Sequence, residues 1–210
     1  MTQDSETKHT PEASATIKSY RQRFPTYARI PATGREREGI LAEMEEMKAL
    51  EAARWRSGYA SGSVYHGADD HIEFLNKVYA VNSQANPLHA DLWPSAIKFE
   101  SEIVSMTAHM LGGDRSGAAA GTPGEICGAV SSGGTESILL AMKSYRDYAR
   151  DKKGITRPEM IVPASAHASF DKAAQYFGID IIHVPVAEDY RADVAATEKA
   201  ISENTIVIVG

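Results

Sequence analysis

The chain has 210 residues, of which 43% are hydrophobic and 24% charged, a globular composition that fits neither collagen, a coiled coil nor a disulfide scaffold. Its net charge of −6 lacks the basic excess of nucleic-acid-binding surfaces, so we expect no nucleic-acid partner. The single cysteine, Cys127, excludes an internal disulfide and suits a reducing compartment, and we expect a cytoplasmic location.

The first 15 residues are polar and of mixed charge, and they predict a disordered tail without the apolar core of a signal peptide. The longest uninterrupted apolar run, Ile138–Met142, has five residues. A membrane-spanning helix needs ~20 apolar residues, so no transmembrane segment is expected.

The segment 16–112 reads as helices joined by irregular stretches, and we expect it to form a helical dimerisation segment. An apolar stripe with a period near 3.6 predicts a helix over 35–53. A second helix is expected to begin with Asp69 or Asp70 as its N-cap and to carry Ile72, Leu75, Val78 and Tyr79 inward. A third is expected to begin at Pro94 and to end at the two glycines 112–113.

Strand-like and helical runs alternate in the segment 113–210, which predicts βαβ units and a parallel sheet. The expected strands are 126–131, 160–162, 180–184 and 205–209, and the expected helices are 135–151, 169–177 and 192–202. Because the sequence stops at Gly210, directly after an apolar strand, we expect this α/β domain to be incomplete there. Cys127 is expected to be a small buried residue of the first strand.

A glycine-rich turn, Ser131-Ser-Gly-Gly-Thr-Glu-Ser137, follows the first expected strand and opens a helix. Gly133 and Gly134 allow close approach of a ligand to the backbone, Thr135 adds a hydroxyl, and the helix N-terminus adds N–H donors, which together can hold a phosphate. A turn that merely caps the helix explains the same residues equally well. The sequence lacks the lysine of a P-loop, the G-x-G-x-x-G and G-x-S-x-G motifs, and zinc-binding motifs. We expect no metal.

Three further segments carry candidate functional residues. His167 follows the second expected strand, at the sheet end where α/β proteins bind ligands, and its ring can lie on a flat cofactor or simply cap the next helix. Asn86 and His89 share a proline-bounded loop and can both donate hydrogen bonds to an anion, although a purely structural loop is the alternative. Tyr65 lies beside a glycine and can transfer a proton or be a partly buried structural tyrosine.

Together these segments resemble the pyridoxal-phosphate enzymes of the aspartate-aminotransferase fold, and more specifically the sphingosine-1-phosphate lyases. The resemblance runs from about Tyr65 to Gly210, and its most specific parts are 86–89, 132–138, 165–167 and Phe170. It implies a fold-type I α/β architecture, with an N-terminal helical segment and part of the parallel-rich sheet of the large domain. It also implies a homodimer whose active site lies at the subunit interface.

The resemblance assigns roles to the candidate residues. Gly133, Gly134 and Thr135 would hold the phosphate of pyridoxal 5'-phosphate, and His167 would stack on its ring. Asn86 and His89 would contact the substrate phosphate, and Tyr65 would lie near the reacting centre. The implied reaction is retro-aldol cleavage of a phosphorylated sphingoid base into a long-chain aldehyde and phosphoethanolamine.

One element of the family pattern is missing from the sequence. The family uses a lysine after a histidine to bind the cofactor covalently, and the sequence has no His-Lys pair. We therefore expect that lysine to lie outside these residues. Two alternatives remain open: a pyridoxal-phosphate-dependent decarboxylase of glutamate or aromatic amino acids, and a non-catalytic dimerising fragment of the same fold.

Overall fold

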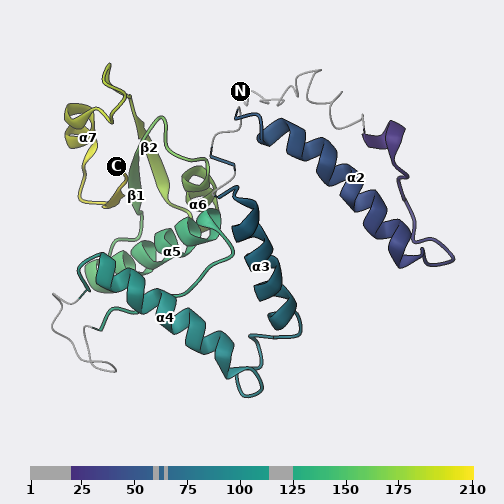
Figure 1. Cartoon of the computed structure of the whole chain (residues 1–210). Helices are drawn as coiled ribbons and strands as arrows, with labels where there is room; N and C mark the ends of the chain where they lie inside the picture. Colours follow the sequence, from purple (N-terminus) through teal and green to yellow (C-terminus); the bar gives the residue numbers. More distant parts are fainter. Residues whose placement is uncertain (1–19, 59–61, 64–65, 114–124) are drawn as a thin grey trace. The chain divides into compact units, whose positions relative to one another are not determined.

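The structure, a computed structural model, describes residues 20–58, 62–63, 66–113 and 125–210 (Figure 1). The expected tail, 1–15, and Tyr65 lie outside the described residues. The chain divides into two compact units, residues 1–84 and 85–210. No helix among the described residues is both long and apolar enough to cross a membrane.

The first unit contains two helices that the apolar periodicity predicts well. They are α2 (Arg37–Trp55) and α3 (Asp69–Asn82). The N-cap of α3 is Ala68, so the expectation of an aspartate cap is wrong. Asp69 is instead the first helical residue, and its carboxylate forms an ion pair with Arg56 at 2.5 Å.

The second unit contains α4 (Pro94–Met110) followed by an α/β layer. That layer comprises α5 (Gly134–Lys153), β1 (Glu159–Pro163), α6 (Ser169–Phe177), β2 (Asp180–Val184), α7 (Val194–Ala200) and β3 (Thr205–Ile208). The three strands form a parallel sheet in the order β2-β1-β3, as the alternation of strands and helices predicts. Because the chain leaves β1 toward β2 and then crosses back to β3, right-handed crossovers place α6 and α7 on opposite faces (Figure 1).

The core lies between the central strand and the helices α5 and α6. Met160 and Val162 of β1 are fully buried against Met142 of α5 and against Ala173 and Ala174 of α6. The alternate residue, Ile161, is also fully buried, so both faces of β1 are covered. The small alanines let α6 approach the sheet closely, which fixes the position of the loop that precedes α6.

The expected strand over 126–131 does not form, and this prediction is wrong. The segment has no β-ladder partner among the described residues and lies against α4 instead. The backbone N–H of Val130 donates to Oε1 of Glu100 at 2.8 Å, and a Cβ added at Gly128 would lie 3.2 Å from Val104. Cys127 is exposed rather than buried, because there is no sheet here to cover it.

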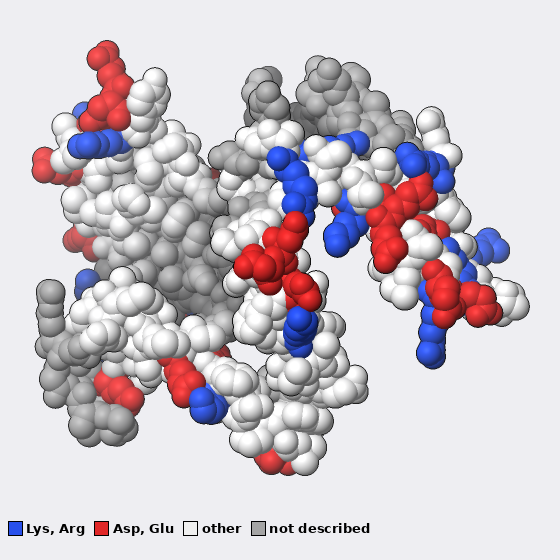
Figure 2. Space-filling view, in the orientation of Figure 1, with Lys and Arg blue, Asp and Glu red and all other residues white. Residues whose placement is uncertain are grey.

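The inward-facing stripes expected on the first helices are also not buried. Leu75, Val78 and Tyr79 of α3 are 49%, 42% and 74% exposed, and Ile72 is half-buried. A helix buries its apolar face only against another element, and the described elements that pack closely are α5, α6, α7 and the sheet. Figure 2 shows mixed charges along α2 and a largely uncharged surface over α4, where Ile97, Ile103 and Met106 are exposed.

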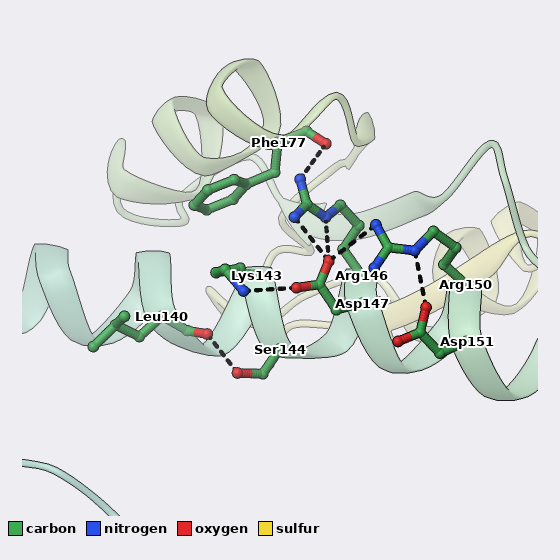
Figure 3. A network of polar contacts seen from close by, with 8 residues as sticks. All are labelled: Leu140, Lys143, Ser144, Arg146, Asp147, Arg150, Asp151 and Phe177. Atoms are coloured by element: carbon green, nitrogen blue, oxygen red, sulfur yellow. Dashed lines mark hydrogen bonds and ion pairs between the residues drawn. The ribbon is translucent and has the colours of Figure 1, made fainter.

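An ion-pair network on α5 ties this helix to α6 (Figure 3). Asp147 accepts from Nζ of Lys143 at 2.7 Å and from Nε of Arg146 at 2.9 Å. Nη1 of Arg146 donates to the carbonyl of Phe177 at 3.4 Å, and the guanidinium lies 5.2 Å from the centre of the Phe177 ring. A cation is therefore held at the negative C-terminal end of α6.

The hydrogen bonds from Lys143 and Arg146 lower the pKa of Asp147 from 3.8 to about 2. A carboxylate whose pKa is lower in the folded state stabilises the fold above the unfolded pKa and loses this contribution as pH falls toward the folded value. We expect Asp147→Asn to flatten the pH dependence of the unfolding free energy between about pH 4 and pH 2. Urea titrations at several pH values measure it, with Ser144→Ala, which removes no titratable group from the same helix, as the control that keeps the slope. An unchanged slope in Asp147→Asn contradicts the prediction.

The C-terminus of α6 requires a left-handed residue. Gly178 has φ 63° and ψ 44°, and its N–H donates to Ala174, after which the chain turns the buried Ile179 into the core. We expect Gly178→Ala to lower the unfolding free energy by about 1–2 kcal/mol, because a Cβ is disfavoured in this conformation by about that amount. Gly178→Asn is the control and should lose less, since asparagine tolerates the left-handed region. Equal stability of the alanine variant and the parent in urea denaturation would show that the turn is unstrained.

Candidate active site

The glycine-rich turn begins helix α5 and presents bare backbone to its surroundings. Gly133 is the N-cap residue, with extended backbone, and Gly134 is the first helical residue. A Cβ added at either glycine would meet no atom within 4 Å, so space is open in front of both residues. The first N–H groups of a helix have no partner within it and carry a partial positive charge, so the turn offers donors to an anionic ligand.

Hydrogen bonds within the segment hold the turn in this shape. Oε2 of Glu136 accepts from the backbone N–H of Ser132 at 2.6 Å. The hydroxyl of Ser131 lies 3.0 Å from the carbonyl oxygen of Gly133 and 2.6 Å from the hydroxyl of Ser137. The side chain and then the backbone of Ser132 lower the pKa of Glu136 by hydrogen bonding to its carboxylate. The turn is therefore formed before any ligand arrives.

His167 lies in the loop between β1 and α6 and is exposed. β1 ends at Pro163, whose carbonyl accepts from Ala166 at 2.9 Å in a tight turn. The backbone N–H of Ser169, the first residue of α6, donates to Nδ1 of His167 at 3.1 Å. The imidazole thus caps α6, and it does so at the carboxyl end of the central strand.

A buried hydroxyl joins the glycine turn to His167. Oγ1 of Thr135 lies 2.9 Å from Oγ of Ser169, and Oγ of Ser169 lies 2.8 Å from Nδ1 of His167. The structure therefore brings Thr135 and His167 to the same end of the sheet. We define Thr135, His167 and Ser169 as the hydroxyl junction.

The Asn86–His89 turn is a separate structure. Oδ1 of Asn86 accepts from the backbone N–H of Leu88 at 3.1 Å, and the carbonyl of Asn86 accepts from the N–H of His89 at 3.0 Å. The His89 ring lies 6.4 Å from the ring of Trp93. Both side chains are exposed, and their described contacts stay within 86–93, so the structure does not join them to the hydroxyl junction.

Ser169 and Glu136 belong to this site although the sequence motifs did not predict them. Ser169 is the first residue of α6 and lies two residues after His167, a spacing that favours a hydrogen bond between the two. Glu136 is the third residue of α5, the position from which a carboxylate commonly caps a helix. Within the described ranges, no three His, Cys, Asp or Glu side chains gather as metal ligands. The roles of the predicted site residues stay predictions.

Comparisons with known proteins agree on one family. Residues 23–208 match the family described as "Pyridoxal-dependent decarboxylase conserved domain". The sphingosine-1-phosphate lyase of Arabidopsis thaliana is 49% identical over 174 residues, which cover 81% of this chain and 31% of that protein. The L-aspartate decarboxylase of Thermococcus kodakarensis is 34% identical over 181 residues, which cover 86% of this chain and 42% of that protein.

A solved structure shows the same fold. The sphingosine-1-phosphate lyase of Burkholderia pseudomallei superposes with a TM-score of 0.83 at 42% identity, over 91% of this chain and 43% of that chain. The chain spans about a third of the length of the curated sphingosine-1-phosphate lyases that it matches. The fold is therefore that of a pyridoxal-phosphate enzyme, as the sequence resemblance implies.

The cap on the glycine turn gives a test of its preformed shape. We expect Glu136→Ala to speed amide hydrogen exchange at Ser132 about five-fold, because the hydrogen bond that protects this amide is lost. Glu136→Gln keeps an acceptor oxygen and should exchange more slowly than Glu136→Ala. Because its pKa is lowered, the Glu136 carboxylate keeps its charge, and this cap, at pH values below the usual range of a glutamate. Equal exchange in the parent and both variants would show that the cap does not hold the turn.

Proposed function

The chain belongs to the pyridoxal-dependent decarboxylase family, and from this premise we propose that the protein is a pyridoxal-phosphate-dependent carbon–carbon lyase. Its proposed substrate is a phosphorylated sphingoid base, cleaved into a long-chain aldehyde and phosphoethanolamine. The observation that carries the proposal is the hydroxyl junction, which sets His167 beside the glycine turn. The 49% identity to a sphingosine-1-phosphate lyase supports the choice of substrate.

The residues at the junction fit pyridoxal phosphate. Gly133 and Gly134 leave open space in front of helix donors, which suits the cofactor phosphate, and the exposed residue Thr135 adds a hydroxyl. The exposed ring of His167, fixed at the same end of the sheet, is suited to stack on the pyridine ring. Bound pyridoxal phosphate supplies an electron sink for the pair of electrons released from the broken carbon–carbon bond.

The remaining candidate residues are proposed to act on the substrate. Asn86 and His89, with exposed polar side chains on a preformed turn, would bind the substrate phosphate. Tyr65 would lie near the reacting centre and move a proton there. Contacts of Asn86 and His89 to the substrate phosphate and the fixed ring of His167 would together set the orientation of the substrate at the site.

Decarboxylation of an amino acid is the second candidate. The 34% identity to an L-aspartate decarboxylase supports it, but the identity to sphingosine-1-phosphate lyases is higher over a similar part of the chain. Turnover assays of the intact protein separate the two. Release of aldehyde from sphinganine 1-phosphate supports the lyase, whereas release of carbon dioxide from aspartate, glutamate or an aromatic amino acid would support the decarboxylase.

We further propose a cytoplasmic homodimer with the active site at the subunit interface. The single cysteine suits a reducing compartment. The exposed apolar side chains of α4, which include Ile103 and Met106, suit contact with a second subunit. Light scattering of the intact protein measures the mass, and a monomer at micromolar concentration would contradict the proposal.

The cofactor role of Thr135 predicts a defined loss of affinity. We expect Thr135→Val to weaken pyridoxal phosphate binding about ten-fold or more, because a hydrogen bond to a charged group is worth about 1.5–3 kcal/mol. Fluorescence titration of the intact protein measures the dissociation constant. Thr107→Val, which removes a hydroxyl bonded to the carbonyl of Ile103 in α4, is the matched control. Equal affinity of the parent and Thr135→Val would remove Thr135 from the phosphate site.

The substrate role of His89 predicts an effect on KM alone. We expect His89→Ala to raise the KM for sphinganine 1-phosphate about ten-fold, because a contact to the substrate phosphate is lost. The affinity for pyridoxal phosphate should not change, since the described contacts of His89 lie outside the hydroxyl junction. Steady-state kinetics and cofactor titration together measure this. A loss of cofactor affinity with unchanged KM would contradict the prediction, because His89 would then contact the cofactor phosphate and not the substrate phosphate.

A further inference from the structure

Ser169 is an unusual residue for its place in the fold. It is 3% exposed and is the buried polar side chain of the described core, on a helix whose other buried residues are Ala173 and Ala174. An alanine at this position would bury no polar atom. The hydroxyl of Ser169 instead forms two hydrogen bonds, one with Thr135 and one with His167.

The hydrogen bonds assign a direction to each proton in the junction. The backbone N–H of Ser169 can only donate, so Nδ1 of His167, at 3.1 Å, presents its lone pair. The neutral ring then carries its proton on Nε2. Oγ of Ser169, at 2.8 Å from the same Nδ1, also donates to it, and in the protein without a ligand its lone pair accepts the hydroxyl proton of Thr135, which can turn to an anionic ligand when one binds.

We propose that Ser169 is a positioning residue that holds His167 as the Nε2–H tautomer and fixes its ring plane beside the glycine turn. The inference rests on the proposed function for the use of that ring, but the arrangement exists in the protein without any ligand. Two donors converge on Nδ1 from one residue, so rotation of the ring or transfer of its proton to Nδ1 breaks both bonds. The exposed edge of the ring therefore presents Nε2–H as its favoured state.

The direct test reads the tautomer of His167 by ¹⁵N NMR of the full chain, without pyridoxal phosphate and at mildly alkaline pH. We expect the parent to show a protonated Nε2 and an unprotonated Nδ1. In Ser169→Ala one of the two donors is lost, and the population of the other tautomer relative to Nε2–H should rise about five-fold. A proton on Nδ1 in the parent, or identical spectra of parent and variant, would overturn the proposal.

Two further variants separate hydrogen bonding from packing. Ser169→Cys keeps nearly the same volume but replaces the hydroxyl by a weak donor, so it should shift the tautomer in the same direction as Ser169→Ala. Ser165→Ala removes an exposed hydroxyl from the same loop and should leave the spectrum of His167 unchanged. If Ser169→Cys resembles the parent while Ser169→Ala does not, or if Ser165→Ala shifts the tautomer equally, the effect is one of packing and the proposal fails.

The outcome is independent of the lyase activity. A tautomer shift in a protein that does not turn over sphinganine 1-phosphate would support the positioning role and reject the proposed function. Turnover by a protein whose His167 tautomer is the same in the parent and in Ser169→Ala would support the proposed function and reject the positioning role. In an active protein, we expect Ser169→Ala to lower kcat more than it raises the KM for sphinganine 1-phosphate, because Ser169 has no proposed contact with the substrate.

Discussion

The geometry of the candidate active site depends on one buried hydroxyl, that of Ser169 at the start of α6. Ser169 accepts from Thr135 at the start of α5 and donates to His167 in the loop after β1, so two segments more than thirty residues apart meet through a single oxygen atom. A buried hydroxyl without partners is costly, and the two contacts use its proton and one of its lone pairs. The glycine turn and the imidazole are thereby fixed together at one end of the sheet.

The core beneath this junction makes its geometry rigid. β1 is covered on both faces, and its fully buried residues Met160 and Val162 pack between α5 and α6. Arg146 of α5 also links the same two helices, because its side chain donates a hydrogen bond to the backbone carbonyl of Phe177 in α6 (Figure 3). Because both helices are held against one strand, their N-termini converge at the carboxyl end of the sheet, where α/β proteins bind ligands.

The residues proposed to be functional divide into two groups with different structural support. The hydroxyl junction is supported by the sheet and by α5 and α6. Asn86 and His89 instead belong to a turn that is held by its own hydrogen bonds and leads into α4. This division matches the two chemical tasks proposed for them, one on the cofactor and one on the substrate phosphate. Binding the cofactor requires a rigid frame, while the turn needs only to present two exposed polar side chains.

The sequence by itself determined the helices and strands of the α/β layer and the start of α4, because periodicity, glycine stops and Pro94 are local signals. It also singled out Thr135 and His167, through the glycine turn and the position of His167 after a strand. Only the tertiary structure decided that Ser169 joins them, since no local pattern reports a contact across 34 residues. It likewise decided that 126–131 is not a strand, because β-propensity cannot supply a ladder partner, and the N–H of Val130 is satisfied by Glu100 instead.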